Sequence, residues 1–197
     1  RDIERVKRAE SEARFERIFD SSPLPKQIHA LATGDLVAIN DAHERLFGYS
    51  LDEIRGPDAW FAQAYPDAVL RASLQPTWKE AVEQARATST PVESPELRIR
   101  CKNGAERIVR GRVAVAGDDV VVTWIDLTDI RRGEAALRDS ERRFRGLVER
   151  SVAGFYVVRD GRILYANERA AAILGRRVED IVGHDAMEDR KSTRLNS

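Results

Sequence analysis

The chain contains 197 residues, of which 42% are hydrophobic and 34% are charged, and its 33 basic side chains balance its 33 acidic ones. This neutral composition gives no signal for binding nucleic acid or an anionic membrane, and no apolar run approaches the roughly 20 residues of a membrane span. Cys101 is the only cysteine, which excludes an internal disulfide and a thiolate metal cluster and fits a reducing compartment. We expect a cytoplasmic chain, with a membrane anchor upstream of Arg1 left open.

The first expected element is a helix whose sequence occurs twice. The chain starts at Arg1 rather than at Met, so we expect the natural protein to extend upstream, with residues 1–10 as part of an upstream helix. Residues 11–19 (SEARFERIF) return as residues 140–148 (SERRFRGLV), and the pattern of residues 40–56 returns in residues 167–183. A repeat of this length indicates a repeated domain rather than a solenoid unit.

Both copies continue with the same local signals. Each has a strand, a Gly turn (Gly34 and Gly161), a second strand and then an Asn. Asn40 and Asn167 are predicted to cap the N-terminus of a helix, because an Asn side chain can accept a hydrogen bond from the first turn. That helix is predicted to end at Gly48 and Gly175, where Gly supplies a left-handed cap. In the first copy, residues 50–53 (SLDE) predict a capping box that opens another short helix.

The remainder of the first copy predicts a helix followed by three strands. Pro66 and Pro76 are taken as breaks, and a helix is expected over residues 78–87. Strands are expected over residues 97–101, 107–115 and 120–126. Asn103-Gly104 favours a two-residue hairpin turn, which would place Ile99 opposite Ile108. In the strand expected over residues 107–115, the apolar side chains move from an even-numbered position, Ile108, to the odd-numbered positions 109, 113 and 115. We therefore expect a bulge at Gly111, where the alternation can change face.

Together these blocks resemble the PAS sensory domain. The residues that carry the resemblance are Asn40, Gly48, Gly56, Asn167, Gly175 and Gly183. The resemblance implies an α+β fold with a five-stranded antiparallel sheet and flanking helices, in which residues 11–128 form a first PAS domain. Residues 140–188 would form the N-terminal half of a second domain. Residues 189–197 (DRKSTRLNS) match a translated sequencing-library adapter, so we expect an artefact outside any fold.

The end of the first copy is similar to the Asp-Ile-Thr exit motif of PAS domains. The resemblance implies that Asp126, Leu127 and Thr128 tie the last strand to a signalling helix, with residues 129–139 as the linker and the helix continuing to about residue 150. On this helix, apolar or small residues alternate at spacings of three and four, which predicts a short coiled-coil seam and a homodimer. The seam consists of Ile130, Leu137, Phe144 and Leu147, with Gly133 and Ser140 between them.

Isolated candidate residues give weaker signals. His43 superficially resembles the phosphoacceptor of histidine kinases, but its surroundings do not match and the second copy has Ala170 there, so we expect a solvated helix face. His29 lies on the first strand, where a ligand cavity could reach it, but a structural or surface role is expected. Trp60, Trp78 and Trp124 are expected in the core rather than against a flavin.

The cofactor is unknown from the sequence. Light-oxygen-voltage (LOV) PAS domains form a flavin adduct with a helical Cys, whereas Cys101 lies at a strand end, so the sequence does not support such an adduct. Residues 65–87 contain no His, which does not support conventional haem binding. No Gly-rich phosphate loop, catalytic carboxylate pair, nucleophile elbow or metal cluster occurs, so we expect no enzymatic activity in this chain.

The resemblance implies a bacterial signal-transduction module. It would sense a ligand, a redox state or a partner and transmit the change through the helix to an output domain. By analogy, that domain is the histidine kinase of a two-component system or a GGDEF or EAL domain acting on cyclic di-GMP. The alternative is a ligand-free module for dimerisation and spacing. The sequence leaves open the ligand, the output, both natural termini and the organism.

Overall fold

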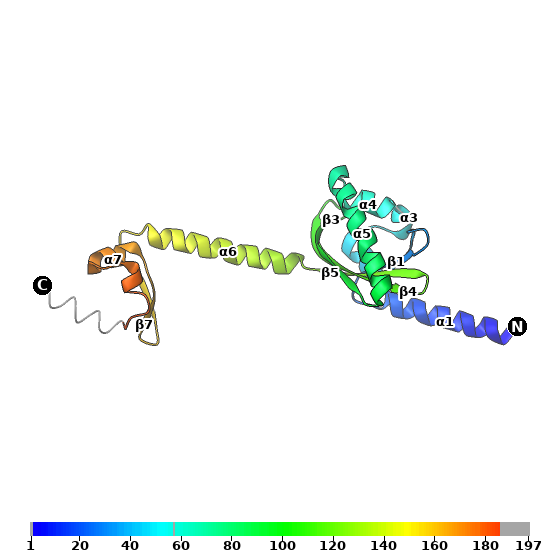
Figure 1. Ribbon diagram of the computed structural model, residues 1–197, viewed down its shortest axis with the longest axis horizontal. Coiled ribbons are helices and arrows are strands. Elements are labelled where there is room, and N and C mark those ends of the chain that lie inside the picture. Colours follow the sequence, from blue (N-terminus) through cyan, green and yellow to red (C-terminus); the bar gives the residue numbers. More distant parts are fainter. Residues whose placement is uncertain (1, 57, 186–197) are drawn as a thin grey trace. The chain divides into compact units, whose positions relative to one another are not determined.

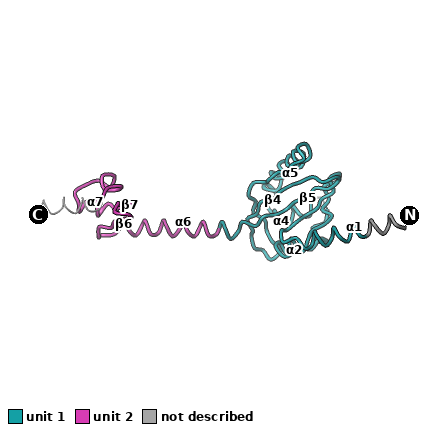
Figure 2. The backbone as a smooth tube through the Cα atoms, turned by 90° about the horizontal axis from the view of Figure 1, so that it is seen from below, with its two compact units in different colours: residues 1–131 teal, residues 132–197 magenta. Residues whose placement is uncertain are grey.

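A five-stranded antiparallel sheet in the order β2-β1-β5-β4-β3 forms the centre of the first part of the chain (Figure 1). Its strands are β1 (Lys26–Ala30), β2 (Leu36–Ile39), β3 (Val92–Arg100), β4 (Glu106–Ala116) and β5 (Asp119–Asp126). The computed structural model describes residues 2–56 and 58–185. Contacts divide the chain into unit 1, residues 1–131, and unit 2, residues 132–197 (Figure 2). The expected five-stranded sheet with flanking helices is confirmed.

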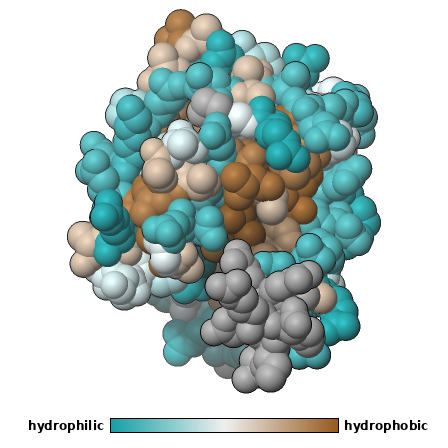
Figure 3. Space-filling view, turned by 90° about the vertical axis from the view of Figure 1, so that its right-hand side faces the viewer, coloured by the Kyte–Doolittle hydropathy of each residue, from teal (hydrophilic) through white to brown (hydrophobic). Residues whose placement is uncertain are grey.

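Helices cover one face of this sheet and enclose an apolar core. They are α2 (Asp41–Phe47), α3 (Leu51–Ile54), α4 (Ala59–Ala64) and α5 (Ala68–Thr88), while α1 (Asp2–Asp20) precedes the sheet. The long helix α5 packs on β3 and β4, and α2 packs on β1. The largest buried apolar side chains include Leu36, Phe47, Ile54, Ile99 and Trp60. The face shown in Figure 3 is mainly hydrophilic, with apolar patches.

The predicted caps of the repeated helix are confirmed in both copies. Asn40 accepts a hydrogen bond from the backbone N–H of His43 at the start of α2, and Gly48 ends the helix with φ 82°. Asn167 and Gly175 do the same for α7 (Glu168–Leu174). The left-handed backbone at the two glycines is one that a side chain would strain, which explains why both copies have Gly there. The capping box of Ser50 and Glu53 is present as predicted.

The expected break at Pro76 is wrong, because α5 runs through it from Ala68 to Thr88. Asp67 accepts hydrogen bonds from the N–H groups of Val69 and Leu70, which starts the helix before the proline. Pro76 lies on the exposed side of the helix. Water can therefore bind the carbonyl that loses its helical N–H partner, and the helix continues past the proline.

The predicted register of the β3–β4 hairpin is also wrong. The Cys101 N–H donates to the carbonyl of Ala105 at 2.8 Å, which leaves a three-residue loop ending at Gly104 with φ 83°. Ile99 therefore lies opposite Arg107 rather than Ile108. A three-residue loop with Gly in the left-handed position is a common hairpin connection. It uses the asparagine–glycine pair differently from the two-residue turn that the sequence favours.

The predicted irregularity at Gly111 belongs to the neighbouring strand. The β4–β5 pairing is continuous from Val109 to Ala116, whereas the β3–β4 pairing shifts register between Glu93 and Glu96. The Ser94 hydroxyl lies in this bulge and accepts a hydrogen bond from the Gly111 N–H at 2.8 Å. The bulge on β3 therefore lies opposite Gly111.

The second part of the chain is smaller. Helix α6 (Thr128–Glu149) is followed by β6 (Tyr156–Arg159) and β7 (Arg162–Ala166), which form a two-stranded sheet, then by α7 and a 3-10 turn, η1 (Val178–Asp180). A small core joins Ile163, Ala166, Ala170, Ala171 and Ile181. All four β6 residues are exposed. Residues 189–197 lie outside the described residues. Among the described helices, none is both long and apolar enough to cross a membrane.

Candidate functional site

A cavity of about 220 Å³ lies in unit 1 between the inner face of the sheet and the helices α4 and α5. Its lining contains several aromatic side chains, because α4, the residue after it, α5 and β5 all contribute large rings. The rings are those of Trp60, Phe61, Tyr65, Trp78 and Trp124. Trp60 and Trp124 belong to the buried core and Trp78 packs against it, as the sequence predicts. The volume is below the roughly 300–1,000 Å³ of pockets for drug-sized molecules, so the cavity suits a small compound.

Strand β1 brings two polar side chains to this cavity. Gln27 and His29 are two residues apart on a strand, so they share the inner face of the sheet. The Trp124 indole N–H donates to Gln27 Oε1 at 3.1 Å, and the Gln27 amide nitrogen lies 2.9 Å from His43 Nε2. Because an amide nitrogen can only donate, His43 Nε2 is the acceptor. A buried polar chain therefore runs from β5 through β1 to α2, and its first two members, Trp124 and Gln27, line the cavity.

The prediction that His43 lies on a solvated helix face is wrong. Its side chain is fully buried, and its ring lies 4.8 Å from that of Phe47 and 5.1 Å from that of Trp60, centroid to centroid. Burial lowers the pKa of His43 to about 3, so the ring is neutral at physiological pH. The remaining proton is on Nδ1, which has no hydrogen-bond partner among the described residues.

His29 is buried, in line with the structural role expected from the sequence, and it also lines the cavity. Its ring packs against Trp78 with a centroid separation of 5.3 Å. Its Nδ1 lies 3.3 Å from the carbonyl oxygen of Gly34. A carbonyl can only accept, so Nδ1 carries the proton and donates. Burial lowers the pKa of His29, which favours this neutral form.

Gly111 allows Trp124 to lie across the sheet. The two residues are partners on β4 and β5. A Cβ atom at Gly111 would lie 3.1 Å from the Trp124 ring and 3.4 Å from the Ser94 hydroxyl oxygen. A side chain there would press on the ring and on the β3 bulge at once. The absence of a side chain at Gly111 therefore helps to define one wall of the cavity.

The structure places the predicted exit residues together at the junction of β5 and α6. Asp126 Oδ1 accepts a hydrogen bond from the N–H of Thr128 at 2.9 Å and another from its hydroxyl, and Asp126 Oδ2 lies 3.4 Å from Arg107. The Thr128 hydroxyl oxygen accepts from the N–H of Ile108 at 3.0 Å, and the N–H of Leu127 donates to the Ile108 carbonyl at 2.8 Å. The first turn of α6 is therefore attached to both β5 and β4.

A second attachment of α6 was not foreseen from the sequence. Arg131, one turn into the helix, donates from Nε to Glu96 Oε2 at 2.9 Å and from its terminal nitrogen to Glu96 Oε1. Arg110 of β4 also binds Glu96, at 3.1 Å. The hydrogen bonds from Arg131 hold the pKa of Glu96 below its usual value. Glu96 directly follows the β3 bulge whose residues Ser94 and Pro95 line the cavity.

The two capping asparagines, Asn40 and Asn167, also make hydrogen bonds to segments that precede their helices. Asn40 also accepts from the N–H of Lys26 at 2.8 Å and donates to the carbonyls of Phe19 and Leu24 at 3.1 and 3.0 Å. Phe19 lies at the end of α1, so the side chain joins the incoming helix to β1 and α2. Asn167 makes the equivalent bonds in unit 2, to Phe155, Val148 and Ala153. Gly56 and Gly183, the last repeated glycines, both have positive φ.

The predicted seam residues are all exposed. Ile130, Leu137, Phe144 and Leu147 have between 55% and 75% of their surface accessible. The rest of α6 is rich in charged side chains, so these residues form its main apolar stripe. Phe144 also contacts Phe155, with ring centroids 6.3 Å apart. The exposure is compatible with the predicted seam and does not test it.

Cys101 is not placed for chemistry at the cavity. Cys101 is buried at the end of β3, where its thiol donates to the Leu46 carbonyl, and it does not line the cavity. Burial raises the pKa of its thiol, which disfavours the reactive thiolate. Within residues 2–56 and 58–185, no three His, Cys, Asp or Glu side chains converge to hold a metal ion.

A sheet of this order, with a small aromatic cavity under its helices, defines an α+β domain of the PAS type. Two family comparisons agree: the family described as "PAS fold" matches residues 36–125, and the family described as "PAS domain" matches residues 142–194. The chain therefore belongs to the PAS family and carries two PAS regions in tandem. PAS domains are sensory modules of signal-transduction proteins. No curated protein matches the sequence.

Several solved structures are similar. One is the PAS domain of an HTR-like protein from Haloarcula marismortui, with 16% identity, a TM-score of 0.48, and coverage of 64% of this chain and 99% of that one. A domain of a sensory box sensor histidine kinase/response regulator from Geobacter sulfurreducens has 13% identity, a TM-score of 0.46, and coverage of 59% and 94%. The N-terminal domain of a diguanylate cyclase with a PAS/PAC sensor from Marinobacter aquaeolei has 13% identity, a TM-score of 0.45, and coverage of 55% of this chain and 98% of that one.

Proposed function

We propose that unit 1 is a sensor whose cavity binds a small molecule and whose output is a change in the position of α6. One observation carries this proposal: the β3 segment that lines the cavity contains Glu96, which holds the first turns of α6 through Arg131. A ligand in the cavity contacts Ser94 and Pro95 of the bulge. Because Glu96 is the next residue, a displacement of the bulge reaches α6 without crossing the rest of the sheet.

The exit residues give α6 a second support. Asp126 and Thr128 attach the helix to β5 and β4, while Glu96 attaches it to β3. These attachments join the first turns of the helix to three different strands. A shift of β3 relative to β4 and β5 therefore changes the direction in which α6 leaves the sheet. Such a change is a discrete repacking of the kind that sensory proteins use.

A homodimer through α6 is the proposed route onward. The exposed apolar stripe of Ile130, Leu137, Phe144 and Leu147 has the spacing of a coiled-coil seam. The stripe is short, which suits a contact that shifts between two packings. The same stripe supports the second candidate function, in which unit 1 binds no ligand and α6 serves only for dimerisation and spacing.

The first experiment separates these two functions. Residues 11–128, purified under native conditions, are examined by absorbance and by native mass spectrometry for a bound chromophore or metabolite. We expect a mass above that of the polypeptide. A preparation that carries no small molecule and gains none on incubation with a metabolite extract would favour the ligand-free module.

The second experiment tests the route through β3. Residues 1–139 are fused to a reporter kinase, and Glu96→Gln is compared with Glu106→Gln. Both changes remove a carboxylate that pairs with an arginine, but the partner of Glu106 is Arg98 of β3, at 3.8 Å, rather than a residue of α6. We expect only Glu96→Gln to change basal activity or the response to ligand. Equal behaviour of the two variants would contradict a signal route through Glu96.

The domain organisation and the parent protein are part of the same proposal. Residues 11–128 are the proposed sensor domain, residues 129–139 the linker and residues 140–188 the first half of a second PAS domain. By analogy with signalling proteins that contain PAS domains, the output domain is a histidine kinase or a GGDEF or EAL domain.

A further inference from the structure

The chemistry of the cavity wall limits what the ligand can be. The charged side chains among the lining residues are two carboxylates, Glu80 and Glu93, and the wall contains no Lys or Arg. Glu80 and Glu93 are both exposed, which places them toward the opening, and Glu93 pairs with Arg110 at 3.7 Å. An anion that entered would pass these carboxylates and would then lie among aromatic rings without a cationic partner, which is strongly unfavourable.

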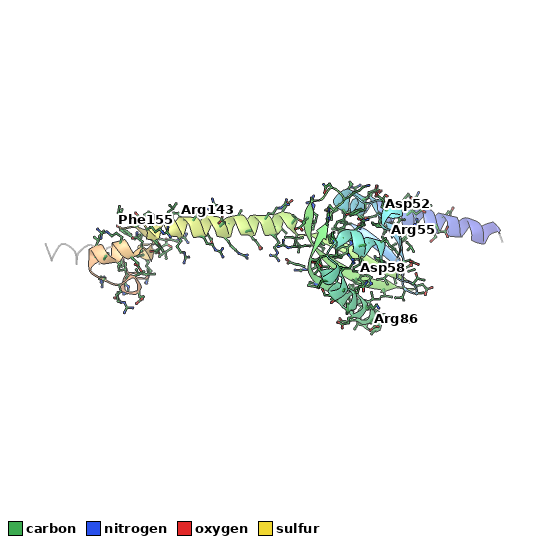
Figure 4. The ribbon with its side chains drawn as sticks, turned by 90° about the horizontal axis from the view of Figure 1, so that it is seen from above. Asp52, Arg55, Asp58, Arg86, Arg143 and Phe155 are labelled. Atoms are coloured by element: carbon green, nitrogen blue, oxygen red, sulfur yellow. The ribbon has the colours of Figure 1, made fainter. Side chains whose placement is uncertain are left out.

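The neighbouring groove does not supply the missing positive charge. This groove has a volume of about 460 Å³ and shares His29, Phe61 and Trp78 with the cavity. The charged residues that line the groove are two bases and two acids: Lys79, Arg86, Glu83 and Asp58. Asp58 and Arg86 are labelled in Figure 4. Their charges cancel, so the groove has no net attraction for an anionic tail.

His29 supplies a defined hydrogen-bond acceptor. Only 4% of its surface is exposed, and Nδ1 is used by the Gly34 carbonyl. In the neutral ring, Nε2 then carries a lone pair and no proton. No described residue makes a hydrogen bond to this atom. His29 lines both the cavity and the groove, so a molecule bound in the cavity lies against its ring.

We propose that the ligand of this cavity is an uncharged aromatic molecule of one or two fused rings, bound by stacking and by a single O–H or N–H group that donates to His29 Nε2. This inference rests on the proposed sensory function and adds the chemical class of the ligand. The aromatic lining provides the stacking surfaces, and the volume limits the number of rings. Selectivity against anions comes from Glu80 and from the absence of a basic residue in the wall.

The test uses three probes of equal ring size with the full chain. 2-Naphthol is neutral at pH 7 and has one donor, 2-methoxynaphthalene lacks the donor, and 2-naphthoate is an anion. Binding is followed by calorimetry. We expect 2-naphthol to bind about tenfold more tightly than 2-methoxynaphthalene, as for one neutral hydrogen bond. We expect 2-naphthoate to bind at least about a hundredfold more weakly than 2-naphthol, because its charge would be buried unpaired.

Two variants test whether His29 accepts the hydrogen bond from the hydroxyl of 2-naphthol. His29→Leu removes the acceptor at similar size, and we expect it to reduce 2-naphthol to the affinity of 2-methoxynaphthalene without changing the latter. Tyr65→Phe is the matched control, because it removes a different polar group from the wall and should leave the tenfold difference in place. The comparison of the three probes on the unaltered chain keeps the test valid even if a variant is poorly folded.

Several results would overturn the inference. They are equal binding of 2-naphthol and 2-methoxynaphthalene, a tenfold difference that persists in His29→Leu, binding of 2-naphthoate as tight as that of 2-naphthol, or no binding of any neutral probe at millimolar concentration. These outcomes are distinct from failure of the proposed function. An anion that binds and changes reporter activity through Glu96 would refute the ligand class and leave the sensor in place.

Discussion

Replacing Asn40 with Ser would separate the two roles of this side chain. Ser is about as good an N-cap as Asn, so the hydrogen bond to the start of α2 can be kept. Its shorter side chain cannot also reach the N–H of Lys26 and the carbonyls of Phe19 and Leu24. Asn40→Ser therefore measures the attachment of α1 and β1 apart from the cap.

The expected loss follows from the hydrogen bonds that disappear. Three bonds of a side chain that is 1% exposed are lost, at about 1 kcal/mol each. The free energy of unfolding of unit 1 should then fall by about 3 kcal/mol, a large part of the roughly 5–15 kcal/mol typical of a domain. Asn40→Ala should cost about 1 kcal/mol more, because the cap is lost too.

Tryptophan fluorescence during urea unfolding of the full chain is the assay. All three Trp residues lie in unit 1, so the signal reports that unit alone. The midpoint should fall by roughly 1–3 M urea in Asn40→Ser. Asn167→Ser, the equivalent change in unit 2, is the control and should leave this midpoint unchanged. A loss below about 0.5 kcal/mol in Asn40→Ser would refute the attachment and leave Asn40 as an ordinary cap.

Four further predictions concern the exit helix, the buried histidines and unit 2. Leu137→Glu should weaken dimerisation by a few kcal/mol, because a carboxylate would be buried in the seam. Sedimentation profiles that match those of the unaltered chain at every concentration would count against the seam. Asp126→Asn should weaken the coupling between the sheet and α6 by about 1–3 kcal/mol. We expect changed activity of the reporter kinase with only a modest fall in thermal stability. Outright unfolding would assign the residue a structural role. From about pH 6.5 down toward pH 3, the unfolding free energy should decrease as the pH is lowered, because burial lowers the pKa of His43 to about 3 and the unfolded chain therefore binds the proton first. His43→Gln should flatten this slope, which is at most about 1.4 kcal/mol per pH unit for each histidine, and an unchanged slope would show that His43 does not titrate in this way. Residues 140–188 alone should give no cooperative thermal transition, in contrast to residues 11–128, because two strands leave unpaired edges and exposed apolar side chains.

Some errors of sequence reasoning have a common cause. Helical position does not reveal whether a polar side chain meets water or a buried polar partner, and the partner of His43 is Gln27, which lies on a strand earlier in the chain. A signal for this pair was present, because Gln27 and His29 alternate with Ile28 on a short strand. The signal was not decisive, because alternation alone does not say which face of the sheet is covered.

The sequence by itself determined the features that depend on neighbours along the chain. The repeat, the asparagine and glycine caps of α2 and α7, and the capping box of Ser50 and Glu53 all follow from local backbone chemistry. The family followed from the same residues, because caps and turns at fixed spacing define the order of the elements.

Only the tertiary structure decided the features that depend on residues far apart. The length of the β3–β4 loop set the register, the bulge moved to β3, and α5 continued through Pro76 because its exposed side allows it. The contact of Glu96 with Arg131 joins residues 35 apart, and the chain from Trp124 through Gln27 to His43 joins three elements. Such contacts form only when packing brings the partners together, since side-chain hydrogen bonds and burial depend on distances in space rather than on spacing in the sequence.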